Sequence, residues 1–139
     1  MIIVAIDYGK RRLGLAAADF AASLAFPAGV IARRSLERDL ATLQRRLKEL
    51  EANRVIVGFP LNMDGTAGPA ARAAERFAQD LRNATGLPVE LQDERLSTVE
   101  AGDRLKSTSP RGRRRVMLDE MAALVILESW LQAQGSPRQ

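Results

Sequence analysis

The sequence predicts a single α/β domain in which helices flank a mixed β-sheet. In the first third of the chain, short apolar runs rich in β-branched residues follow one another with short links, which is typical of an antiparallel meander. Further along, amphipathic helix patterns alternate with apolar runs, as they do where helical crossovers join parallel strands. A chain of 139 residues has the length of one domain. We expect this domain to cover residues 1–134, followed by a flexible tail at residues 135–139.

Three strands are expected before the first helix, over Ile2–Ile6, Leu13–Ala18 and Ala28–Ala32. The short glycine-containing turn between the first two strands predicts a hairpin. Ser35 can cap the helix that follows, and acidic residues occupy its first turn. Leucines spaced by four and three residues give this helix one apolar face. They are Leu36, Leu40, Leu43, Leu47 and Leu50.

The middle of the chain predicts a strand, a helix and another strand. The run Arg54–Phe59 is apolar and ends at Pro60. A polar loop then leads to Pro69, which is a favourable first residue for a helix. Gly86 stops that helix, and Val89–Gln92 forms a short fifth strand.

The last part of the chain predicts two helices separated by a loop. A capping box at Ser97–Glu100 marks the start of the first one. Lys106–Arg115 is polar and basic and is expected to be a loop, whereas Leu118–Leu131 is apolar on nearly every side and predicts a buried helix. With right-handed crossovers, the whole order of elements fits a ribonuclease H-like sheet with the strand order 3-2-1-4-5.

The composition restricts the chemistry that this chain can perform. It has no histidine and no cysteine, which excludes histidine acid/base catalysis, cysteine nucleophiles and the usual zinc ligands. Lysine and arginine number 21 against 17 acidic residues, so nucleic acid is the natural partner, although a generic arginine-rich surface has the same composition. No apolar run reaches the ~20 residues of a membrane span, and no signal-peptide pattern is present. We therefore expect a cytoplasmic protein without membrane contact.

Three acidic residues on three separate elements are the candidates for catalysis. Asp7 ends the first strand and Glu94 follows the fifth, and the carboxyl ends of these parallel strands meet at one edge of the sheet. Asp119 begins the last helix and would lie at its buried end. Each also has a simpler explanation. Asp7 could accept hydrogen bonds from the amides of the turn that follows it, and Glu94 could be an ordinary surface charge. Asp119 could be favoured by the helix dipole at the start of its helix. Glu120 is about 100° further around the helix and is expected to face solvent.

Carboxylate clusters bind Mg²⁺ or Mn²⁺, and such ions can activate water for phosphodiester hydrolysis. A cationic segment beside this edge would bind the phosphate backbone independently of sequence. We expect nucleic-acid contacts from Lys10, Arg11, Arg12, Asn62, Arg95, Arg111, Arg113, Arg114 and Arg115.

Four separated motifs closely resemble the YqgF/RuvX family. They are DYGKRRLG at Asp7–Gly14, VGFPLNMDG at Val57–Gly65, DERLST at Asp93–Thr98, and Asp119 with the alanines at 122 and 123. The resemblance extends from residue 2 to residue 131. It implies a ribonuclease H-like fold related to the RuvC Holliday-junction resolvases. It also implies a Mg²⁺- or Mn²⁺-dependent nuclease that matures the 5′ end of pre-16S rRNA.

On this resemblance, Asp7, Glu94 and Asp119 are the catalytic, metal-binding carboxylates. RuvC-type sites usually carry a fourth acidic residue one turn further along the last helix, where this chain has alanine. The site therefore resembles a three-carboxylate version. The candidates that would complete the coordination of a second ion are Asn62, Asp64, Asp93 and the substrate phosphate.

Three other functions stay open at this point. A Holliday junction resolvase would act on four-way DNA as a homodimer, because symmetric cleavage needs two active sites. A non-catalytic nucleic-acid-binding module could have the same fold. The pattern D-x-G-x-x-x-x-G also resembles the phosphate loop of actin-like kinases, but those proteins need two such domains around the nucleotide.

Overall fold

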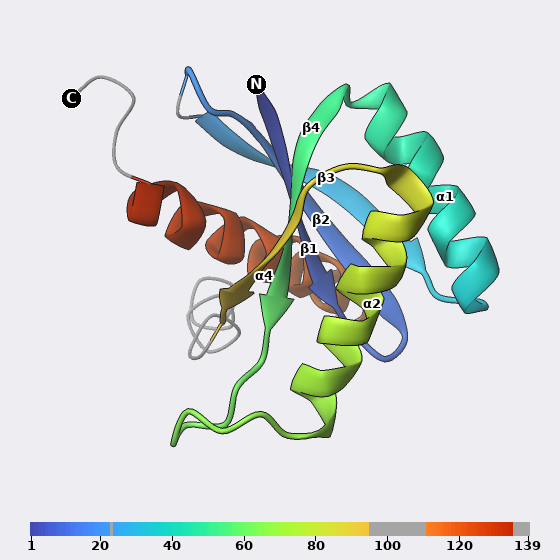
Figure 1. The fold of residues 1–139 in the computed structure, drawn as a ribbon, viewed down its shortest axis with the longest axis vertical. Coiled ribbons are helices and arrows are strands. Elements are labelled where there is room, and N and C mark those ends of the chain that lie inside the picture. Colours follow the sequence, from blue (N-terminus) through green and yellow to red (C-terminus); the bar gives the residue numbers. More distant parts are fainter. Residues whose placement is uncertain (23, 95–110, 135–139) are drawn as a thin grey trace.

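The computed structural model describes residues 1–22, 24–94 and 111–134, with only the backbone for residues 111–117. Its centre is a five-stranded sheet in the order β3-β2-β1-β4-β5, which confirms the predicted order (Figure 1). β1 is antiparallel to β2 and parallel to β4, and β4 is parallel to β5. The carboxyl ends of β1, β4 and β5 therefore share one edge.

The first three strands are longer than expected. They are β1 (Ile2–Tyr8), β2 (Arg12–Asp19) and β3 (Leu24–Ala32). β1 therefore includes Asp7, which lies within the strand and opposite Gly14 of β2. β3 begins before Pro27, and an edge strand tolerates a proline because one side of its backbone has no partner strand.

The next four elements confirm the sequence patterns. α1 (Leu36–Glu49) begins after Ser35, whose side chain accepts a hydrogen bond from the Arg38 N–H at 3.2 Å. β4 (Ala52–Phe59) leads through a loop to α2 (Pro69–Thr85), and β5 (Val89–Asp93) follows.

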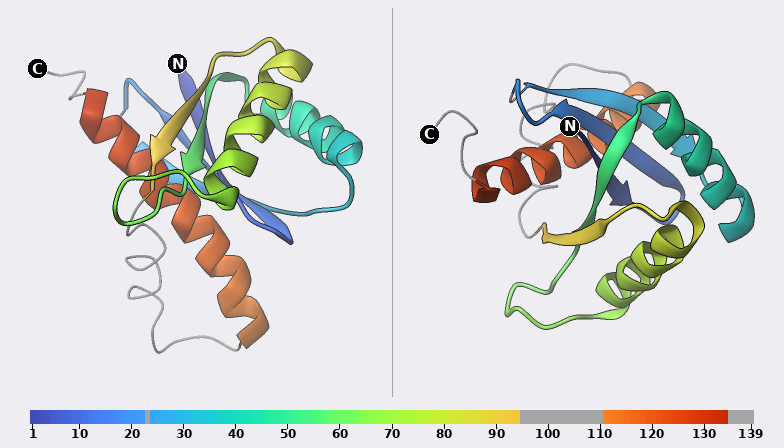
Figure 2. Two further views of the ribbon diagram at one scale, coloured as in Figure 1. Left: turned by 60° about the horizontal axis from the view of Figure 1, so that its bottom comes forward. Right: turned by 45° about the horizontal axis from the view of Figure 1, so that its top comes forward.

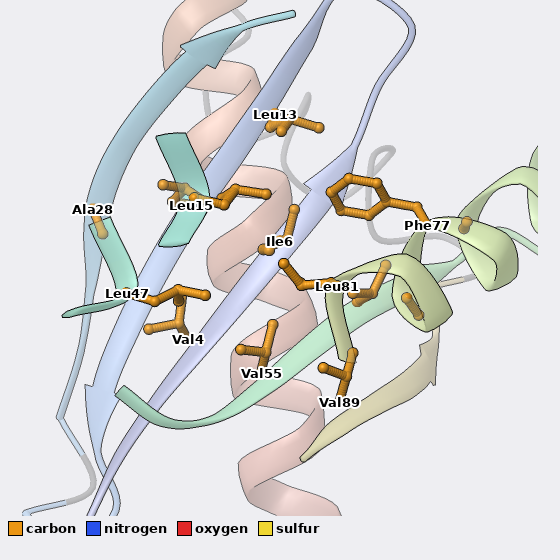
Figure 3. Close-up of a cluster of buried hydrophobic side chains, with 14 of the residues drawn as sticks. Val4, Ile6, Leu13, Leu15, Ala28, Leu47, Val55, Phe77, Leu81 and Val89 are labelled. Carbon is orange, nitrogen blue, oxygen red and sulfur yellow. The ribbon is translucent and has the colours of Figure 1, made fainter. Parts of the chain in front are cut away.

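Alternating side chains of the strands build two cores, one on each face of the sheet. Val4 and Ile6 pack with α1 and α2, as Figure 3 shows for the cluster that includes Leu47, Phe77 and Leu81. On the other face, α4 (Arg111–Gln134) crosses the sheet (Figure 2). The residues that pack there include Ile3, Ala5, Ala16, Ile56, Ala123, Ile126 and Trp130. By the same alternation, Asp7 belongs to the α4 face and Tyr8 to the α1 and α2 face.

The structure corrects three expectations about α4. The helix begins at Arg111, so the loop prediction was wrong for residues 111–115; arginine is a strong helix former, and the run simply extends the helix. Asp119 consequently lies about two turns inside the helix and not at its start. Glu120 does not face solvent freely, because its carboxylate is half-buried and accepts a hydrogen bond from the Gly29 N–H of β3 at 3.1 Å.

Some of the predictions lie outside the described residues. They are the helix from Ser97, the candidate Arg95, the loop residues 106–110 and the tail at residues 135–139. No helix in the described part of the chain combines the length and the apolar composition that crossing a membrane requires.

Candidate active site

Asp7 lies at the centre of the candidate site, between two glycines of the neighbouring strands. Gly14 of β2 is directly opposite Asp7. On the other side, Ile6 pairs with Val57 of β4 in a parallel register. The next residue of β4, Gly58, therefore lies beside Asp7. The three residues form a row across the sheet on the face that α4 covers.

Each glycine makes room for one of the other two carboxylate residues. A Cβ atom on Gly14 would overlap the backbone carbonyl of Asp119. A Cβ atom on Gly58 would overlap the carboxylate of Glu94 and also contact Ile126. Asp119 therefore packs over Gly14 and Glu94 over Gly58, on either side of Asp7. The role of Gly58 could not be predicted from the sequence, because a glycine inside an apolar strand carries no signal of what packs on it.

Asp7 is electrostatically coupled to both of the other carboxylates. Burial, and then the charge of Asp119, raise the pKa of Asp7 from 3.8 to about 6. Burial also raises the pKa of Glu94 from 4.5 to about 8, with further contributions from Asp7 and from Asp93. Without a bound cation, Glu94 therefore stays largely protonated near neutral pH, whereas Asp7 keeps its proton only below about pH 6.

Arg12 supplies a positive charge to this group. Its guanidinium donates a hydrogen bond to the carboxylate of Asp119 and forms an ion pair with it. Arg12 therefore points toward the carboxylates, whereas Lys10 and Arg11 are exposed on the turn between β1 and β2. That turn is closed by its own backbone, since the Gly9 N–H donates to the carbonyl of Arg12 at 3.1 Å.

Of the remaining candidates, Asn62 and Asp64 belong to the loop between β4 and α2. Asn62 donates to the hydroxyl of Thr66 at 3.0 Å, and Asp64 accepts from the Thr66 N–H at 3.0 Å, so both brace the loop between β4 and α2. Asp93 is exposed at the end of β5. The four arginines between residues 111 and 115 belong to the first turns of α4 by their backbone, and their side chains are outside the described part.

The donor set fits a hard divalent ion in its chemistry. Within the described residues, no three acidic side chains are close enough to hold an ion as they stand. Nevertheless, carboxylate oxygens are the ligands that Mg²⁺ and Mn²⁺ prefer, and the raised pKa values of Asp7 and Glu94 reflect buried negative charge that a cation would relieve.

Solved structures of other proteins share the fold of this chain. RuvC from Thermus thermophilus matches with a TM-score of 0.60 at 14% identity, over 98% of both chains. The fowlpox virus Holliday junction resolvase matches with a TM-score of 0.61 at 14% identity, over 96% of this chain and 99% of that one. At this identity the similarity shows the fold alone, which is the ribonuclease H-like fold of the RuvC-type resolvases.

Sequence comparison then gives the family. The model of the family described as RuvX, Holliday junction resolvase, matches residues 1–133. A protein of Anaeromyxobacter sp. strain Fw109-5, described as a candidate pre-16S rRNA nuclease, is 47% identical over 132 residues, 94% of this chain and 96% of that protein. A protein of Myxococcus xanthus with the same description is 41% identical over 138 residues, 99% of this chain and 91% of that protein. The chain belongs to the RuvX family.

Proposed function

We propose that this chain is a divalent-metal-dependent endonuclease of structured nucleic acid, and that its reaction is 5′-end processing of pre-16S rRNA. The observation that carries the proposal is that Asp119 packs over Gly14 and Glu94 over Gly58, on either side of Asp7. The descriptions of the relatives at 41–47% identity favour the RNA substrate.

Asp7, Glu94 and Asp119 would hold the ion. When bound there, a divalent ion supplies an activated water and neutralises charge on the leaving oxygen of a phosphodiester. The chain's own contribution is to place Asp119 and Glu94 on either side of Asp7, with α4 fixed against β2 by the close contact at Gly14. α4 covers this face and shields the charges from solvent, which strengthens every electrostatic interaction with the substrate.

The exposed cations of the turn between β1 and β2 would orient the substrate. Lys10 and Arg11 lie only three and four residues after Asp7 and are exposed. Contacts from such side chains to phosphate oxygens position the backbone without reading bases. This arrangement suits an enzyme that recognises the shape of its substrate.

A second candidate function is resolution of four-way DNA junctions. The description of the matching family favours it, since that description names a Holliday junction resolvase. A junction has two strands to be cut symmetrically, so this function calls for a homodimer. A monomer suffices to trim one RNA strand.

The test is cleavage of a labelled pre-16S 5′-leader RNA and a labelled four-way DNA junction with Mg²⁺, Mn²⁺ or EDTA. We expect metal-dependent cleavage by the wild type and a loss of at least about 100-fold in Asp7→Asn. Asp19→Asn is the matched control, because it makes the same change at the opposite end of the sheet. Equal cleavage by Asp7→Asn and Asp19→Asn would overturn the site assignment. Binding of either substrate without cleavage would identify a non-catalytic module.

A further inference from the structure

A groove opens on the face of the sheet opposite the three carboxylates, beside the carboxyl end of β1. It has a volume of about 430 Å³, and its lining includes Tyr8, Gly9, Lys10, Arg33, Pro69 and Ala70. We call it the β1–α2 groove. Asp7 and Tyr8 are consecutive residues of β1, so their side chains point to opposite faces. Only the end of one strand therefore separates the groove from the carboxylates.

Arg33 holds the walls of the groove in place. Its Nη1 donates to the carbonyl of Gly9 at 2.9 Å, and its backbone N–H donates to the carbonyl of Arg11 at 2.9 Å. These bonds fix the turn between β1 and β2 against the segment that follows β3. The groove is therefore organised before any ligand arrives, which lowers the entropy cost of binding.

The charges around the groove favour an anion. Lys10 is exposed, and the side chain of Arg33 is 24% exposed. The ion-pair partner of Arg33 is Asp39, which lies 3.5 Å away, is buried and does not line the groove. The first turn of α2 contains no acidic residue. The ion pair with Asp39 offsets part of the charge of Arg33, so Lys10 supplies most of the positive charge that a phosphate would meet in this groove.

The aromatic ring of the groove does not serve as a platform for bases. Arg33 and Phe77 each lie 4.4 Å from the centre of the Tyr8 ring, so they occupy its two faces. No face is left on which a base could stack. The groove is therefore suited to a backbone phosphate and not to a nucleobase.

We propose that the β1–α2 groove binds a backbone phosphate of the same nucleic-acid strand whose scissile phosphodiester lies at Asp7, Glu94 and Asp119. This inference rests on the proposed nuclease function, because a polynucleotide necessarily carries further phosphates beside the one that is cut. The contact adds affinity that is independent of sequence and sensitive to salt.

The test is the affinity of the full chain for labelled 5′-leader RNA and labelled four-way DNA, measured by fluorescence anisotropy in EDTA over a salt series. The main variant is Ala70→Glu, which places a carboxylate in the groove. Ala70 is exposed in the first turn of α2, where a glutamate favours the helix, so this variant keeps the fold. Ala133→Glu is the matched control, since it makes the same charge change at an exposed site in the last turn of α4.

We expect Ala70→Glu to bind at least about fivefold more weakly, and Ala133→Glu to stay within about twofold of the wild type. Lys10→Gln should lower the slope of log affinity against log salt by about 0.7–0.9, as the loss of one phosphate contact does. If Ala70→Glu and Ala133→Glu bind with equal affinity while the wild type binds and cleaves, the phosphate-binding role of the groove is overturned and the nuclease function is not. A wild type that binds neither nucleic acid would overturn the nuclease function and the groove with it.

Discussion

The guanidinium of Arg12 and the carboxylate of Asp119 form an ion pair that ties the β1–β2 hairpin to α4. Both side chains are shielded, with 31% and 19% of their surfaces exposed. Asp119 in turn raises the pKa of Asp7. Arg12 is thus an internal counter-ion of a group of like charges, and a divalent ion that binds Asp119 has to compete with it.

Replacing Arg12 by glutamine tests this relationship. We expect Arg12→Gln to lower the free energy of unfolding in EDTA by about 1–3 kcal/mol, because Asp119 then loses the counter-ion that the described residues give it. We also expect Mn²⁺ to bind several-fold more tightly, because its competitor is gone. Urea unfolding and calorimetric Mn²⁺ titration measure the two effects.

Arg54→Gln is the control for this prediction. It removes another half-exposed ion pair, with Glu90 on β5. Its Mn²⁺ affinity should equal that of the wild type. If Arg12→Gln also leaves the Mn²⁺ affinity unchanged, Arg12 does not compete for the site.

Gly14→Ala should push α4 away from β2. The added methyl group would overlap the backbone carbonyl of Asp119, which cannot rotate away as a side chain would. We expect a loss of about 1–3 kcal/mol in the free energy of unfolding, together with weaker Mn²⁺ binding because Asp119 is displaced.

Gly86→Ala is the control that separates the loss of stability from the loss of Mn²⁺ binding. Gly86 has a φ of +71°, and no atom of the described residues lies within 4 Å of the place that a Cβ would take, so alanine there costs about 1–2 kcal/mol through backbone strain alone. Its Mn²⁺ affinity should be that of the wild type. Weaker Mn²⁺ binding in both variants would trace the effect to lost stability and not to the site.

Asp119 and Glu120 are adjacent acidic residues, and the structure gives them different roles. Asp119 packs over Gly14 beside Asp7, whereas Glu120 accepts a hydrogen bond from the Gly29 N–H of β3. Asp119→Asn should therefore lower metal-dependent cleavage by at least about 100-fold. Glu120→Gln should cleave within a few-fold of the wild type, because the amide oxygen can still accept from Gly29. Similar losses in both variants would show that the site depends on α4 as a whole.

The sheet and most of its helices could be predicted from the sequence because their signals are local. Apolar runs, the Ser35 cap and Pro69 each act within a few residues, and the order of strands follows from crossover handedness. The same reasoning placed Asp7 and Glu94 at one edge, because Asp7 lies near the carboxyl end of β1 and Glu94 directly follows β5, which runs in the same direction.

The contacts between distant segments could not be predicted in this way. Nothing near Arg12 in the sequence indicates Asp119 as its partner, since the two are 107 residues apart. The position of Asp119 inside α4 could not be predicted, because the run of charged residues before it is typical of a solvated loop. The arginines in that run nevertheless have a high helix propensity, and they form the first turns of α4. The role of Gly58 depends on what packs over it, which only the folded chain decides.

The contribution of Asp7 and Glu94 to the stability of the metal-free protein should fall as pH rises from about 4 to about 8. The pKa values of Asp7 and Glu94 are about 6 and about 8 in the folded protein, against 3.8 and 4.5 as ordinary values. The folded state therefore binds these protons more tightly than the unfolded chain. The stabilisation is complete below about pH 4 and is lost as pH passes the two folded values. We expect Glu94→Gln, in EDTA, to lose a few kcal/mol less free energy of unfolding than the wild type between pH 5 and pH 8.5.

Urea unfolding at both pH values measures this difference, and Asp19→Asn, at the opposite end of the sheet, should follow the wild type. Mn²⁺ should stabilise the wild type more at pH 8.5 than at pH 5, because the ion binds the carboxylates in their ionised form. It should stabilise Glu94→Gln much less at either pH. If the wild type and Glu94→Gln instead lose the same free energy between the two pH values, Glu94 does not lie in a cluster of buried carboxylates, and the arrangement over Gly58 is wrong.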